Sequence, residues 1–146
     1  MAGKSKKKPE IWTPEFSGKN RLPFVSSTIS AGFPSPADDY LEQKLDLNDL
    51  LVRHPSATFF VKAKGTSMIN AGIHDGDILV VDRSLAPGNK SIVIGVVDGE
   101  FTVKRILKDG ARLFLLPEND EFKKIEITKE MDFSIWGVVS HVIHKV

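Results

Sequence analysis

From Thr58 onward the chain is a succession of short apolar runs, rich in β-branched and aromatic residues and separated by Gly, Asp, Asn and Pro. Runs of this length and composition, bounded by turn residues, are typical of strands rather than helices. The predicted strands are TFFVKA, DILVVD, SIVIGVV, EFTVKRIL, RLFLLP, KKIEI and SIWGVVSHVIHKV. The pattern therefore predicts a mostly β body whose core is built between paired strands.

The central pair of these strands surrounds Asp98-Gly99, which fits a two-residue hairpin turn. Such a turn sets Val93 opposite Lys104. One face of the hairpin then carries core residues: Ile92, Ile94, Val96, Phe101 and Val103. The second face is too apolar for open solvent, and it carries Val93, Gly95, Val97, Thr102, Lys104 and Ile106. We therefore expect Lys104 to lie on an apolar surface, where Gly95 leaves room for another backbone.

Residues 1–36 have a different composition and predict a flexible N-terminal arm with no strand or helix of useful length. Five of the eight prolines of the chain fall there. Residues 37–146 are expected to form the β-rich domain, with a short helical lead-in. A helix is predicted from Asp38 or Asp39, with Tyr40, Leu41, Lys44 and Leu45 on one face. A second short helical turn is predicted at Leu47, Leu50 and Leu51.

The overall composition excludes several classes of protein. At 146 residues the chain is long enough for one domain with a real core, and its net charge of +1 argues against a broad nucleic-acid surface. It has no apolar run of the roughly 20 residues needed to cross a bilayer, and its basic start is not followed by a signal-type apolar stretch. A cytoplasmic location is expected. Cysteine is absent, which excludes disulfides and thiolate chemistry. Lys4 and Lys6–Lys8 predict a solvated tail, with weak phosphate contact as the alternative.

One serine could carry chemistry. Ser67, in KGTSMINAG, follows a predicted strand and lies just after Gly65. A glycine there permits a sharp turn that exposes the hydroxyl and frees nearby backbone N–H groups. A plain turn has the same local pattern, so the interpretation depends on a nearby base.

Lys104 and His74 are the candidate bases. The stem of Lys104 could lie on apolar surface with its ammonium in water. Alternatively, burial could leave a neutral amine able to act as general base, as in Ser-Lys pairs. His74, in IHDGD beside Asp75 and Asp77, leaves a Ser-His-Asp triad open.

The remaining histidines give little sign of a metal site. His141 and His144 would point to opposite faces of a strand, so we expect no metal site there. No cofactor is expected.

The segments FFVKAKGTSM, DGDILVVD and VVDGEFTVKRI occur in this order, preceded by FPSPADDYLEQKLDLNDLL. From about Ser30 to Val142 the chain resembles the UmuD and LexA family of Ser-Lys self-cleaving peptidases. The resemblance implies a LexA C-terminal-like, curved β domain of the β-clip type. It also implies a homodimer in which an extended N-terminal arm docks against the catalytic cleft of the same or the partner subunit.

The resemblance also assigns roles to individual residues. Ser67 matches the nucleophile and Lys104 the general base. The backbone N–H groups of Thr66 and Ser67 are the implied oxyanion hole. Ala31-Gly32 matches the bond that such a protein cuts in itself.

The biological role that the resemblance implies is in the SOS response to DNA damage. RecA on single-stranded DNA would stimulate self-cleavage, and the processed form would be a subunit of an error-prone translesion polymerase, bound to a UmuC-like Y-family catalytic subunit. Direct DNA contact is expected to be weak or absent.

The chain departs from the family pattern at two points. Ala31 stands where UmuD proteins often have Cys, although LexA-type repressors have Ala there. The lysine-rich start is not a family feature.

Three other functions are alternatives to this one. A LexA-type repressor needs a helix-turn-helix domain, for which residues 1–36 are too few and too rich in proline. A signal peptidase needs a membrane anchor. A non-catalytic, polymerase-binding β domain is the remaining alternative.

Overall fold

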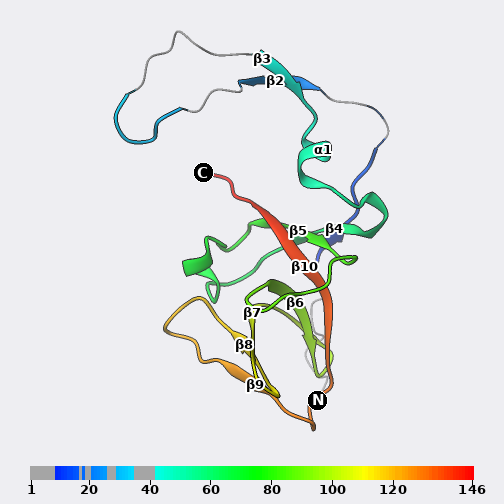
Figure 1. Ribbon diagram of the computed structural model, residues 1–146, viewed down its shortest axis with the longest axis vertical. Coiled ribbons are helices and arrows are strands. Elements are labelled where there is room, and N and C mark those ends of the chain that lie inside the picture. Colours follow the sequence, from blue (N-terminus) through cyan, green and yellow to red (C-terminus); the bar gives the residue numbers. More distant parts are fainter. Residues whose placement is uncertain (1–8, 17, 19–20, 26–28, 35–41) are drawn as a thin grey trace, which may run out of the picture. The chain divides into compact units, whose positions relative to one another are not determined.

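The computed structural model describes residues 9–16, 18, 21–25, 29–34 and 42–146 (Figure 1). By their internal contacts, these form two compact units. One comprises His54–Val146 together with the N-terminal stretch through Pro14, and the other comprises Glu15–Arg53. The lysine-rich start and the predicted helical residues 37–41 lie outside the described residues.

The larger unit is built on one eight-stranded antiparallel sheet. Its strand order is β1-β4-β5-β10-β6-β7-β8-β9. The strands are β1 (Ile11–Trp12), β4 (Thr58–Lys62), β5 (Ile78–Asp82), β6 (Ile92–Val97), β7 (Glu100–Asp109), β8 (Arg112–Leu116), β9 (Ile125–Ile127) and β10 (Phe133–Ile143). Short 3₁₀ turns precede β4 at Pro55–Ala57 and β5 at Ile69–Ala71. All seven strands predicted from Thr58 onward are confirmed.

The β6–β7 hairpin has the predicted register, with Val93 opposite Lys104 and Val97 opposite Glu100. Its turn has positive φ at both central residues, 48° at Asp98 and 81° at Gly99. This is the backbone that a tight, right-twisted hairpin requires, and Asp-Gly adopts it readily. Local turn chemistry therefore fixes which side chains share a face with Lys104.

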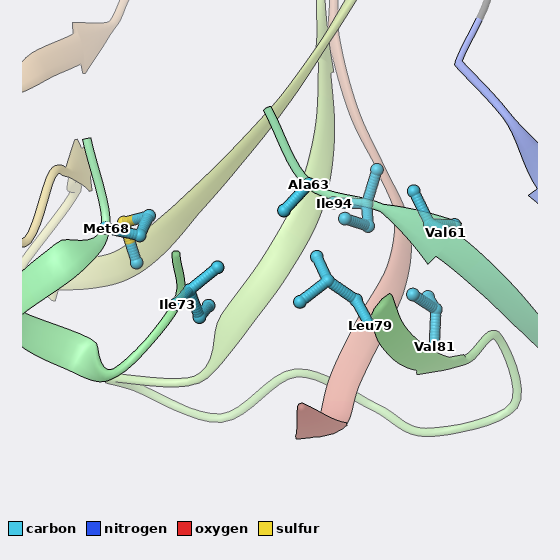
Figure 2. Packing of buried hydrophobic residues seen from close by; sticks show 7 residues of the cluster. All are labelled: Val61, Ala63, Met68, Ile73, Leu79, Val81 and Ile94. Carbon is cyan, nitrogen blue, oxygen red and sulfur yellow. The ribbon is translucent and has the colours of Figure 1, made fainter. Parts of the chain in front are cut away.

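Apolar clusters lie on both faces of the hairpin. One contains Val93, Ile106 and Leu115. The other contains Val61, Ala63, Met68, Ile73, Leu79, Val81 and Ile94 (Figure 2). Val93 and Ile94, which are neighbours in β6, thus belong to different clusters. This confirms that neither face of the hairpin is open to solvent. The expectation that Phe101 is a core residue is wrong: it is 42% exposed near the hairpin end, edge-on to Trp136 at 6.1 Å between ring centroids.

Strand β10 lies between β5 and β6, and its register shifts against both neighbours. The shift against β6 falls between Ile135 and Gly137. A Cβ at Gly137 would lie 2.6 Å from Val81 Cγ1, so only glycine fits there without movement of the core. Bulges of this kind bend a strand and increase its twist.

The smaller unit corrects two predictions. Glu42–Leu45 is strand β3, paired with β2 (Leu22–Val25), so the predicted helix is wrong over these residues, and the arm does contain a strand. A leucine spacing of four fits a helix, but here cross-strand pairing decides the structure. Pro23 is tolerated because a two-stranded ribbon leaves one edge of each strand unpaired. The predicted helical turn is confirmed as α1 (Leu47–Leu51), capped by Asp46, whose side chain accepts a hydrogen bond from Asn48 N at 2.9 Å.

Candidate active site

Ser67 lies in the loop that follows β4, and the turn before it needs a glycine. Gly65 has a φ of +91°, a conformation that side chains other than glycine rarely adopt. Its N–H donates to Asp75 Oδ1 at 2.6 Å. Just upstream, Ala63 N donates to Asp77 O at 2.8 Å and Ala63 O accepts from Gly76 N at 2.9 Å. The turn ahead of β5 therefore fixes the chain where it leaves β4 and reverses towards the serine.

Met68 anchors the same loop in the core. Its side chain is 3% exposed and packs in the apolar cluster of Figure 2, whereas the next residue, Ile69, is 40% exposed. Burial of Met68 directly beside a half-buried Ser67 restricts where the serine hydroxyl can lie.

The connection between β8 and β9 holds the loop from the other side. Ser67 O accepts from Glu118 N at 2.8 Å, and Thr66 O accepts from Asn119 Nδ2 at 2.9 Å. Glu118 itself is paired with Arg105 on β7 at 2.5 Å. These contacts were not predicted from the sequence, because residues 117–120 (Pro-Glu-Asn-Asp) indicate only a turn and nothing in them shows that they bind the serine loop.

Strand β7 brings Lys104 to the serine. Lys104 Nζ lies 3.2 Å from Ser67 Oγ, 2.8 Å from Thr102 Oγ1 and 3.0 Å from Val103 O. Thr102 is two residues away on the same strand, so it shares a face with Lys104. The two sequence-predicted residues, 37 apart in the chain, are thus in hydrogen-bond contact.

Burial lowers the pKa of Lys104, because removing an ammonium from water disfavours its charged form. A neutral amine has two N–H donors and one lone pair. The Thr102 hydroxyl and the Val103 carbonyl can accept both N–H bonds, which leaves the lone pair for the proton of Ser67. Chemically, the arrangement can deprotonate a serine hydroxyl without a histidine or a metal ion.

A groove of about 1050 Å³ opens beside the pair. It is lined by Ser67 and Lys104 and by apolar side chains that include Ile94, Val103 and Trp136. Residues 9–11 line it too, where β1 pairs with β4. Its size and mostly apolar lining suit an extended peptide.

His74 does not join this site. Its Nδ1 lies 3.6 Å from Asp77 Oδ2, and its ring lies 4.5 Å from that of His144. The residue in contact with Ser67 is Lys104 and not His74, so the structure does not support a Ser-His-Asp triad. His141 lies in β10, but His144 follows the end of that strand, so the expectation that the two occupy opposite faces of one strand is wrong.

Ala31 and Gly32 are both exposed, within the smaller unit. A Cβ added at Gly32 would have no atom within 4 Å.

Comparison with known proteins identifies the family. Residues 23–140 match the Peptidase S24-like family. Protein MucA of Salmonella typhimurium is 49% identical over 131 residues, which cover 87% of this chain and 89% of that protein. Protein ImpA of Salmonella typhimurium is 47% identical over 124 residues, 84% of this chain and 83% of the relative. Protein SamA of Salmonella typhimurium strain LT2 is 47% identical over 127 residues, 87% and 88% of the two chains.

The chain belongs to the Peptidase S24-like family. It is a UmuD-like serine peptidase of the self-cleaving LexA and UmuD type, which places it with proteins of SOS mutagenesis. The predicted fold, mostly β and of the β-clip type, is confirmed. Within the described part of the chain, no helix combines the length and apolarity that a membrane crossing needs.

Proposed function

We propose that Ser67 and Lys104 form a Ser-Lys dyad that cuts the chain's own Ala31-Gly32 bond. The observation that carries this proposal is the 3.2 Å contact between Lys104 Nζ and Ser67 Oγ beside a peptide-sized groove. Burial lowers the pKa of Lys104, which favours the neutral amine that a general base requires. The arm, residues 1–36, would supply the substrate to the domain of residues 37–146.

In the proposed reaction, neutral Lys104 takes the Ser67 proton while Oγ bonds to the Ala31 carbonyl carbon. The resulting oxyanion is held by the backbone N–H groups of Thr66 and Ser67. Among the described residues neither N–H has a hydrogen-bond partner, which suits that role. The Ala31–Gly32 C–N bond then breaks, and Lys104 gives its proton to the departing amine.

A water molecule, deprotonated by Lys104, hydrolyses the ester between Ser67 and Ala31. The water's oxygen ends in the new carboxyl group, and the serine regains its proton. The products are residues 1–31 and 32–146. Ala31 suits the attacked position because a small side chain asks little of the groove.

Because the substrate is tethered, restraint is the central regulatory problem. Holding the reacting groups together can supply roughly 7–11 kcal/mol of the barrier reduction. A mostly undocked arm or a mostly protonated Lys104 would keep the resting rate low. An activator that favours the docked arm ~10⁴-fold must bind that state about 5.5 kcal/mol more tightly.

We propose that this activator is the RecA filament on single-stranded DNA, in the cytoplasm. The processed form would be a homodimer that binds a UmuC-like Y-family polymerase subunit in translesion synthesis. The family and the relatives MucA, ImpA and SamA support this role. With a net charge of +1, the chain is not proposed to contact DNA broadly by itself.

The test is cleavage by purified variants incubated with RecA, single-stranded DNA and a nucleotide. Ser67→Ala and Lys104→Ala should leave the chain whole. Matched controls come from exposed residues of the same kind: Lys108→Ala on the same strand as Lys104, and Ser134→Ala on β10. Both controls should cleave at the wild-type rate. Cleavage that persists in either dyad variant would overturn the assignment.

Gly32→Phe tests the bond itself. The open space around Gly32 means that a larger side chain causes no local clash, so a block would come from crowding at the attacked carbonyl. If Gly32→Phe were cleaved at the wild-type rate, the Ala31-Gly32 bond would not be the cleavage site.

A further inference from the structure

Three potential metal ligands from two distant parts of the chain meet at one end of the β5–β10 strand pair. His74 and Asp77 lie in the turn that leads into β5, and His144 directly follows β10. The antiparallel register of these strands ends with Ile143 opposite Ile78. The same register brings the residue after Ile143 alongside the residue before Ile78, which is why His144 meets Asp77.

The contacts converge on a buried carboxylate. Asp77 is 3% exposed. Its Oδ1 lies 2.6 Å from His144 Nδ1, and its Oδ2 lies 3.6 Å from His74 Nδ1. One potential ligand atom from each residue lies within 4.8 Å of the others. Both imidazoles are almost half exposed, 45% for His74 and 43% for His144, so the cluster opens to solvent on one side.

We propose that His74, Asp77 and His144 bind one divalent transition-metal ion of the Zn²⁺ type. Two imidazole nitrogens and one carboxylate oxygen suit zinc and its neighbours, whereas Mg²⁺ and Ca²⁺ take mostly oxygen ligands. Three protein ligands leave a fourth position to water from the open side. The site is separate from Ser67 and Lys104, so the proposal does not depend on the peptidase mechanism.

Binding an ion requires the ligand side chains to adjust, because the three ligand atoms lie within 4.8 Å of one another. Bonds of about 2.0–2.2 Å in a tetrahedron put ligand atoms roughly 3.4 Å apart. Asp77 Oδ2 lies 3.6 Å from His74 Nδ1, which is close to this spacing. His144 Nδ1 lies 2.6 Å from the other oxygen, Oδ1, so the His144 ring must turn to share an ion with Oδ2 and His74. His144 lies beyond the end of its strand, where side-chain rotation can supply the change. The metal ion then replaces the proton that His144 and Asp77 share.

The carboxylate of Asp77 is held in position by its neighbours. Its Oδ2 accepts from the His74 backbone N–H at 2.7 Å, and its Oδ1 lies 2.6 Å from His144 Nδ1. A ligand that is already fixed in this way loses little conformational freedom when it binds an ion.

A bound ion would brace the active-site loop. Asp77 O and Gly76 N both bond to Ala63, and Asp75 accepts from Gly65. The turn that carries two of the ligands is therefore the turn that positions the chain ahead of Ser67. Metal binding would tie this turn to the C-terminal end of β10 and raise the melting temperature.

The chain contains a matched control. His54 Nδ1 lies 2.6 Å from Asp82 Oδ2, and Asp82 is also 3% exposed. This pair reproduces the His144–Asp77 contact but has Ser84 hydroxyl and N–H on the other carboxylate oxygen in place of a second imidazole. His54→Gln should therefore leave metal binding unchanged.

The experiment titrates the untagged, full-length protein with Zn²⁺ by calorimetry and with Co²⁺ by visible absorption. Without cysteine in the chain, no thiolate competes for either ion. We expect one ion per chain with a dissociation constant in roughly the micromolar range. His74→Gln and His144→Gln should each weaken binding about tenfold or more. His54→Gln should bind as wild type, and Mg²⁺ should not raise the melting temperature.

Three results would overturn the proposal. The first is no saturable binding of either ion. The second is one-to-one binding that His74→Gln and His144→Gln both leave unchanged, which would put the metal elsewhere. The third is equal weakening by His54→Gln. Because both ligand imidazoles are partly exposed, circular dichroism should show folded variants, and a binding loss with retained fold and a wild-type His54→Gln supports the site.

Discussion

Thr102→Val should slow self-cleavage by removing the hydroxyl that orients the base. Thr102 Oγ1 is the nearest hydrogen-bond partner of Lys104 Nζ, at 2.8 Å, against 3.2 Å for Ser67 Oγ. Without this acceptor, one N–H of the neutral amine is left over and can turn towards Ser67. The lone pair is then less often aimed at the serine proton.

The size of the effect follows from one hydrogen bond in a half-buried site. A neutral hydrogen bond contributes about 1 kcal/mol net, and 1.36 kcal/mol is tenfold in rate. The limiting rate at high pH should therefore fall about five- to tenfold. The charged ammonium loses more than the amine when Thr102 is removed. The pKa of Lys104 should consequently fall further, and the rise of the rate should move to lower pH.

The assay is the first-order rate of fragment appearance, followed by intact mass from neutral to alkaline pH. Thr102→Ser is the matched control, because it keeps the hydroxyl and removes only a methyl group. It should cleave within about threefold of wild type, since it retains the roughly 1 kcal/mol bond. A Thr102→Val variant with the wild-type pH profile would refute the orienting role, as would an equal loss in Thr102→Ser.

Two further predictions concern stability. Gly137→Ala would place a Cβ 2.6 Å from a core methyl group, and it should lower the free energy of unfolding in urea by about 1–3 kcal/mol. The control is Gly88→Ala, whose Cβ would have its nearest contact at 3.7 Å and should leave the stability almost unchanged. Equal effects of the two substitutions would contradict the packing argument. Burial raises the pKa of Asp82, but hydrogen bonds from Ser84 and His54 outweigh it and the net pKa is lowered. The ionised carboxylate therefore adds stability above the ordinary aspartate pKa of roughly 3.9, and this is lost as pH falls through the lowered folded-state value. Asp82→Asn should thus be less stable than wild type by about 1–3 kcal/mol at pH 7, with the gap narrowing in acid; a gap independent of pH would contradict it.

Local turn chemistry made part of the fold predictable. Asp98-Gly99 specifies one turn type, the turn specifies the register, and the register places Lys104 opposite Val93. The strands were predictable for a similar reason, because composition and turn residues delimit each one. Residues 42–45 show the limit: a four-residue leucine spacing fits a helix, and only pairing with Leu22–Val25 makes this segment a strand.

The two residues of the dyad were predictable in two steps. The Gly-Thr-Ser turn and the hairpin register singled out Ser67 and Lys104 as candidates, and because neither pattern is specific alone, the family resemblance was needed to assign their roles. The groups that hold them were missed. Glu118 and Asn119 contact the serine loop through backbone and side-chain hydrogen bonds. These contacts depend on the pairing of β8 with β7, which places the connection after β8 beside the loop. His144 meets Asp77 only because of the β5–β10 register, which no local pattern encodes.

The most direct test of the central claim is intact mass of the purified chain after incubation across a series of rising pH, without activator. Because the pKa of Lys104 is lowered but the amine still needs to lose its proton, the rate should rise with pH and then level off. The fragment released should begin at Gly32. Lys104→Arg, which cannot deprotonate in this range, should stay whole. A wild-type chain that stays whole at every pH, and again with RecA on single-stranded DNA and a nucleotide, would contradict the account.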